Sequence, residues 1–169
     1  MPDWLTYVLS AWVACELASL AGIRGARRYV GVAAVGSVLP DLVKAFYLLN
    51  TYGHIDLIAF SVPLATPVGA ILVAGLVSSF FDTSEGRSVF AYMAIGVAIH
   101  IVWDFTLHPF GGGEMMLLPL SFEQSSLGLI WSDSMLPLAI IAIPAVMLLS
   151  VGLAHPRSAG PRGHRRRGL

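Results

Sequence analysis

Five apolar stretches, each close to the length of a membrane span, dominate the chain and limit the folds open to it. A transmembrane α-helix needs about 20 mainly apolar residues. Of 169 residues, 56% are hydrophobic and only 12% are charged, against roughly 25% charged in soluble domains. A soluble enzyme, a disordered protein and a nucleic-acid-binding domain are therefore disfavoured. The expected spans are residues 4–22, 29–49, 57–81, 88–107 and 135–154.

The pattern predicts an all-α integral membrane bundle of about five transmembrane helices, folded as a single domain over residues 1–156. The connection between the fourth and fifth spans, residues 108–134, is long for a loop. Its apolar pieces, 115–120 and 127–131, are too short to span a membrane, so we expect a re-entrant or interfacial segment there. Trp131 suits the membrane interface.

Basic residues mark one side of the predicted bundle. Arg24, Arg27 and Arg28 fall between the first two spans, and Arg87 falls between the third and fourth. Residues 157–169 hold five arginines and no acid, which predicts a disordered cytoplasmic tail. Because cytoplasmic loops are enriched in Lys and Arg, we expect a multi-pass protein of the cell membrane with the N-terminus outside.

Ionisable side chains inside spans are costly and usually face the protein interior. With this orientation most of them gather towards the outer side, whereas Glu16 lies deeper. The outer group consists of Asp41, Lys44, His54, Asp56, His100, Asp104 and His108.

His100 and Asp104 are four residues apart and share one face of a helix. An imidazole and a carboxylate at this spacing can hold a divalent metal, and Asp41 is the natural third ligand. Two structural alternatives stay open: a hydrogen-bonded His100–Asp104 pair, and a buried ion pair between Asp41 and Lys44. Lys44 counts against a metal unless its ammonium reaches the headgroups.

These residues resemble a known family, the membrane-bound, predicted metal-dependent hydrolases whose type member is a LexA-regulated inner-membrane protein. The resemblance runs from about Met1 to Leu120. Its motifs are a small-residue stretch ending in Leu-Pro-Asp, a Gly-x3-His-x3-Asp motif, and a glycine-rich turn followed by a Leu-Leu-x-Pro-like segment. They correspond here to residues 36–41, 96–104, 111–113 and 117–120.

The resemblance implies a helical membrane protein with a His/Asp metal site formed by Asp41, His100 and Asp104, and a hydrolytic activity. The chain also departs from the family pattern. Tyr7 and Ala65 stand where the family usually has histidines, and Lys44 follows Leu-Pro-Asp where a second acid is frequent.

Two functions follow. The first is a metal-dependent hydrolase with zinc as the divalent ion, because the ligands mix nitrogen and oxygen. It would act on a lipid-like ester or phosphoester at the outer side of the bilayer, and Asp56 or Glu114 would be the general base. The alternative is a degenerate, non-catalytic member acting as a scaffold or partner subunit, with a protein partner or as a homo-oligomer. A proton-coupled transporter is disfavoured because no internal repeat is present.

Overall fold

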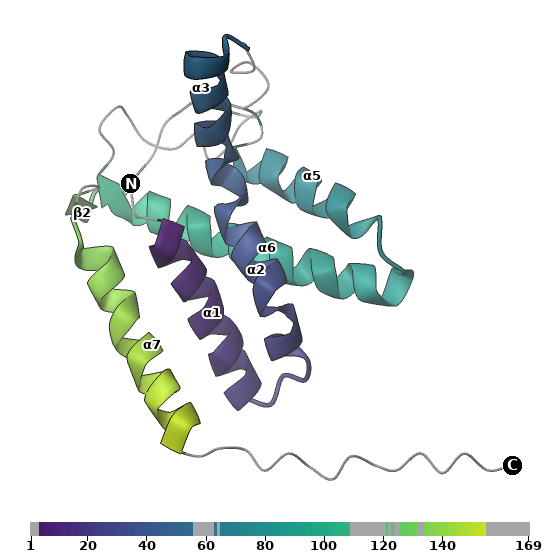
Figure 1. Cartoon of the computed structure of the whole chain (residues 1–169), viewed down its shortest axis with the longest axis vertical. Helices are drawn as coiled ribbons and strands as arrows, with labels where there is room; N and C mark the ends of the chain where they lie inside the picture. The colour runs from purple at the N-terminus through teal and green to yellow at the C-terminus, as the bar shows by residue number, and fades with distance from the viewer. Residues whose placement is uncertain are drawn as a thin grey trace, which may run out of the picture.

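The computed structural model describes residues 4–55, 63, 65–108, 121, 123, 126–131 and 134–154. Helices account for most of this part of the chain (Figure 1). They are α1 (Trp4–Leu20), η1 (Ala26–Tyr29), α2 (Val30–Val38), η2 (Leu39–Asp41), α3 (Leu42–Gly53), α5 (Pro67–Ser78), α6 (Thr83–Thr106) and α7 (Leu136–Ala154). The predicted predominance of helix is therefore confirmed.

Local sequence explains where these helices begin and end. Gly22 and Gly25 take positive φ angles of 89° and 87° between α1 and η1, which side chains with a Cβ rarely adopt. Pro40 lies in the tight turn η2, where α2 passes into α3. Thr66 caps α5 by accepting a hydrogen bond from the backbone N–H of Gly69 at 3.2 Å. The residue after the cap is Pro67, the type favoured at a first helical position.

The helices pack in two groups. Helices α1, α2 and α7 lie side by side, and α6 crosses α1 and α2, with α5 along α6 (Figure 1). One buried cluster joins α2, α5 and α6, and a smaller cluster joins α1 to α2. The contact between α2 and α6 is the most extensive in the described structure, and it is the contact that places the polar residues discussed below.

Two helices are long and apolar enough to cross a membrane: the continuous segment Ala26–Gly53 and α6. The other apolar helices, Trp4–Leu20, Pro67–Ser78 and Leu136–Gly152, are shorter. The twelve residues of α5 rise about 18 Å at 1.5 Å per residue, less than the roughly 30 Å of a bilayer core. Helices therefore occur in all five expected spans, but a five-span integral bundle is not confirmed.

The connection between α6 and α7 is described only in part. Two short strands, β1 (Leu107–His108) and β2 (Ile130–Trp131), pair in parallel. The His108 and Trp131 rings meet with centroids 4.8 Å apart. Of the two apolar pieces predicted to be re-entrant or interfacial, 127–131 contains β2, whereas 115–120 lies outside the described residues, as do the glycine-rich turn 111–113, the tail 157–169 and residues 1–3.

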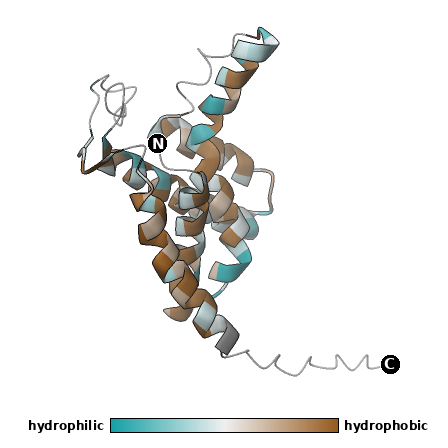
Figure 2. Ribbon diagram, turned by 60° about the vertical axis from the view of Figure 1, so that its left-hand side comes forward, coloured by the Kyte–Doolittle hydropathy of each residue, from teal (hydrophilic) through white to brown (hydrophobic). Residues whose placement is uncertain are grey.

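Hydrophobic residues run along most of the helices (Figure 2), and many large apolar side chains of the described residues are exposed. On α7, Ile143, Val146 and Met147 are each more than 60% exposed. Exposed apolar surface of this extent marks a face that contacts a membrane or another protein.

Candidate metal and catalytic site

Close backbone contact between α2 and α6 places His100. A Cβ added to Gly96 would lie 2.6 Å from the backbone nitrogen of Ser37 and 2.9 Å from the carbonyl carbon of Gly36. A Cβ added to Gly36 would lie 2.8 Å from the Cα of Met93, so neither Gly36 nor Gly96 has room for a side chain. One turn after Gly96, the His100 ring is buried, and its Nδ1 lies 2.7 Å from the carbonyl oxygen of Ser37. The glycine motifs of the sequence thus serve to bring this histidine against α2.

The Ser37 contact fixes the protonation of one histidine nitrogen. A carbonyl oxygen can only accept a hydrogen bond, so Nδ1 of His100 donates. The other nitrogen, Nε2, lies 3.0 Å from Oδ2 of Asp104 and 3.9 Å from Oδ1 of Asp41. Two carboxylates face Nε2. The arrangement is therefore favourable only when Nε2 carries the second proton of the imidazole ring or binds a cation.

Tyr7 completes the inner side of the site. Its ring is fully buried and stacks on His100, with the centroids 4.0 Å apart and the planes at 20°. Its hydroxyl donates a hydrogen bond to Oδ1 of Asp104, which leaves Oδ2 of that carboxylate facing His100. Nearby, the Trp103 indole N–H donates to Ser10 Oγ at 2.9 Å and ties α6 to α1.

Lys44 occupies the other side of Asp41. Its Nζ lies 2.5 Å from Oδ2 of Asp41, whose side chain is almost wholly buried, while the lysine side chain is 31% exposed. Of the two roles open for this lysine, the ion pair with Asp41 is the one present. The pair compensates the buried carboxylate, which would otherwise be strongly destabilising.

The chemistry of this donor set suits zinc, which binds imidazole nitrogen and carboxylate oxygen. The hydrogen bond from Nδ1 to Ser37 also fits, since metal-binding histidines usually donate their other N–H to a carbonyl or carboxylate. However, within the described ranges no group of three His, Cys, Asp or Glu side chains stands ready to hold a metal ion. The contact between Nε2 and Asp104 and the contact between Asp41 and Lys44 would both have to open.

Of the other predicted candidates, those that the structure describes are not brought into this site. The suggested general bases, Asp56 and Glu114, lie outside the described residues. His54 is exposed and ends α3 with a positive φ of 55°, about 20 Å along the helix from Asp41 at 1.5 Å per residue. His108 lies beyond the end of α6. Glu16 is separate, as expected, and pairs with Arg27.

Two contributors were not assigned a role from the sequence. Ser37 acts through a backbone carbonyl, so its side chain gives no signal. In the sequence, Tyr7 stands out only as the residue in place of a family histidine. In the structure it contacts both His100 and Asp104. The second such position, Ala65, lies in the turn before α5.

Comparison with protein families now gives a context for this geometry. A family model described as zinc dependent phospholipase C matches residues 11–155. No curated protein and no solved structure matches the chain. The match confirms the prediction that the divalent metal is zinc. It also supports membership of a zinc-dependent, lipid hydrolase-like family. It does not specifically support the LexA-regulated type that the sequence resembles.

Proposed function

Because the chain belongs to the zinc dependent phospholipase C family, we propose that it is a membrane-bound hydrolase that cleaves the phosphodiester of a phospholipid. A phospholipase C breaks the bond between phosphorus and the glycerol oxygen. The oxygen of water becomes bonded to phosphorus, and its proton is transferred to the departing diacylglycerol oxygen. The products are a diacylglycerol and a phosphorylated headgroup.

One observation carries this proposal: a buried histidine with one nitrogen held by a backbone carbonyl turns its other nitrogen towards two carboxylates. Asp41, His100 and Asp104 would hold the zinc. When bound, zinc would polarise a phosphoryl oxygen and stabilise the negative charge of the transition state. Ser37 orients His100, and Tyr7 orients Asp104. Asp56 and Glu114 remain the proposed general bases for the attacking water.

The proposed location is the membrane, with the site near the outer side of the bilayer. Two helices of spanning length and the apolar exposed face of α7 support this location. The position of the arginines on alternate connections supports an outer N-terminus and a cytoplasmic C-terminus. A hydrolase placed in this way would take its substrate from the bilayer itself.

Phosphodiester hydrolysis in reconstituted vesicles tests this function. The full chain, purified without a metal-affinity tag, should release diacylglycerol from vesicle phospholipid. The release should stop after chelation, return on adding zinc, and be absent in Asp104→Asn. A zinc-replete wild type that releases no diacylglycerol from a panel of phospholipids would overturn the proposal.

A second function, that of a non-catalytic scaffold, is favoured because the polar side chains of the site already pair with one another. Lys44 neutralises Asp41, and Tyr7 and His100 share Asp104. Such a network can hold helices together without metal, so the non-catalytic scaffold stays the alternative. It predicts that the variants lose stability rather than zinc.

A further inference from the structure

An open hollow on the surface includes Lys44, the ion-pair partner of Asp41, in its lining. It has a volume of about 510 Å³ and lies between the start of α1 and α3. Its lining consists of Trp4, Val43, Lys44, Tyr47 and Leu48. Lys44 is the one charged residue of this lining, and it also contacts Asp41 at 2.5 Å. A single ammonium group therefore joins an apolar hollow to the buried carboxylate of the site.

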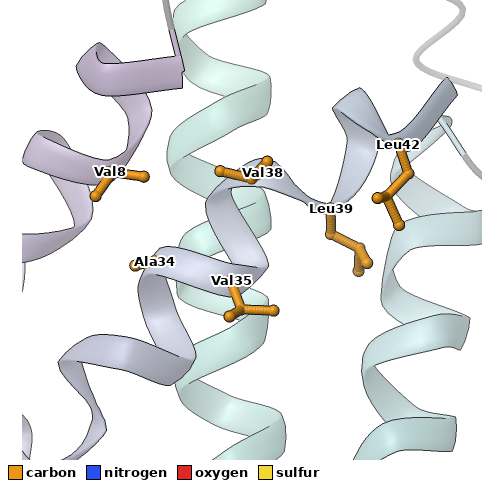
Figure 3. A pocket seen from close by; sticks show the side chains of 6 residues that line it. All are labelled: Val8, Ala34, Val35, Val38, Leu39 and Leu42. Atoms are coloured by element: carbon orange, nitrogen blue, oxygen red, sulfur yellow. The ribbon is translucent and has the colours of Figure 1, made fainter. Parts of the chain in front are cut away.

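A second hollow, of about 340 Å³, lies between α1 and the segment that runs from α2 through η2 to the start of α3 (Figure 3). Every lining residue is apolar: Val8, Ala34, Val35, Val38, Leu39 and Leu42. Trp4 and Val8 are one turn apart on α1, and Leu42 and Val43 are neighbours in α3. Both hollows therefore lie along the boundary between α1 and the α2–α3 segment, which we term the α1–α3 seam. Among the residues that the structure describes, Lys44 is the only charged one that lines it.

We propose that the α1–α3 seam binds the phospholipid substrate, with Lys44 on its phosphate and an acyl chain against the apolar lining. The proposal rests on the function proposed above and identifies how the substrate is held. A single cation in an apolar groove complements an amphiphile with one anionic group. A small soluble anion would gain nothing from the apolar lining, and an uncharged lipid would gain nothing from the ammonium group.

Charge considerations explain how Lys44 can serve both the carboxylate and the phosphate. An ammonium group and a divalent ion repel one another when both approach the same carboxylate. Metal bound at Asp41 would therefore favour a new partner for Lys44, and the lysine side chain already reaches the surface. A substrate phosphate in the seam supplies that partner.

Binding of a short-chain probe tests the ammonium contact. The probe is a dihexanoyl phosphatidylcholine in which a phosphonate replaces the scissile ester, so that it cannot be cleaved, and dihexanoylglycerol is the uncharged comparison. Titration calorimetry on the zinc-supplemented full chain should show phosphonate binding weakened about tenfold in Lys44→Gln, as expected for a charge-assisted hydrogen bond. Lys44→Arg should restore the affinity, and dihexanoylglycerol should bind all these proteins equally.

A matched pair of variants tests the apolar part. Leu48 lines the seam and is 55% exposed, whereas Leu49 is 45% exposed and lies outside the lining. The comparison uses the dihexanoyl phosphonate and the same phosphonate with shorter, dibutanoyl chains. Leu48→Ser should reduce the higher affinity of the dihexanoyl probe relative to the dibutanoyl probe, and Leu49→Ser should leave that difference unchanged.

A control variant separates this inference from the proposed hydrolase function. His100→Ala removes a zinc ligand and should abolish turnover. Because Lys44 then stays paired with Asp41, the variant should also bind the phosphonate more weakly, but it should keep the chain-length preference that depends on Leu48. The inference is overturned if Lys44→Gln binds the phosphonate as well as wild type does, or if it loses both probes equally. Equal effects of Leu48→Ser and Leu49→Ser on chain-length preference would also overturn it.

Discussion

At the scale of single residues, the site depends on how His100 and Asp104 are oriented. The His100 ring is fixed from one side by Ser37 and from the other by stacking on Tyr7. Asp104 is fixed by the Tyr7 hydroxyl. Orientation of this kind reduces the entropy that ligands lose when they bind a metal, and partners outside the ligand set typically change metal affinity 10- to 100-fold.

Tyr7→Phe isolates the hydroxyl, because it keeps the stacked ring and removes only the hydrogen bond to Asp104. We expect zinc affinity, measured by competition with a chelator, to fall about tenfold. Tyr52→Phe is the matched control, since Tyr52 is 79% exposed and lies at the far end of α3. An unchanged zinc affinity in Tyr7→Phe would show that the hydroxyl does not position a ligand.

Part of this residue-scale arrangement could be predicted from the sequence. The spacing of His100 and Asp104 placed them on one helical face, and they do contact each other. The Asp41–Lys44 contact follows in the same way from a separation of three residues. The approach of Asp41 to His100 depends on how α2 packs on α6, which helical spacing alone cannot give. The contact of Tyr7 with Asp104 joins residues 97 positions apart and was equally inaccessible.

At the scale of elements, the crossing of α2 and α6 determines the geometry of the site. Gly36 and Gly96 let the two backbones touch, which brings the Ser37 carbonyl within reach of His100. Small residues at helix crossings are the usual means of close approach in membrane proteins. The sequence motifs contained both glycines, but only the packed structure shows that they face each other.

Gly96→Ala should force these helices apart, since its Cβ would lie 2.6 Å from Ser37 N. We expect a loss of about 1–3 kcal/mol in unfolding free energy, typical of overpacking, together with weaker zinc binding. Gly31→Ala is the control, because its added Cβ would meet nothing within 4 Å, and it should be neutral or slightly stabilising. Unfolding followed by tryptophan fluorescence in detergent makes the comparison, and equal stability of the two variants would contradict the packing argument.

At the scale of the whole molecule, composition predicted the helical class but overstated the regularity of the spans. Residues 29–49 form helix that passes through the turn at Leu39–Asp41, where Pro40 lacks an amide proton. Within residues 57–81, the described residues include α5, which is shorter than a membrane span. Apolar content indicates that a segment avoids water, whereas helix length depends on local features such as Pro67, the residue at which α5 begins.

The proposed orientation makes a prediction at this scale. In a Cys15→Ser background, Ser134→Cys should react with a membrane-impermeant maleimide in intact cells. Ser158→Cys should react only after the membrane is permeabilised, because the arginine-rich tail is expected on the cytoplasmic side. The opposite labelling pattern would reverse the orientation, and labelling of both positions in intact cells would contradict the membrane-spanning arrangement.

The central claim is that His100 and Asp104 form a zinc site, and zinc content measures it most directly. Wild type and the His100→Ala/Asp104→Ala variant should be purified in mild detergent without a metal-affinity tag and analysed by inductively coupled plasma mass spectrometry. We predict about one zinc ion per wild-type chain, as three protein ligands would hold, and its loss in the variant. Zinc absent from both proteins, with the variant merely less stable, would contradict the account and assign these residues to helix packing.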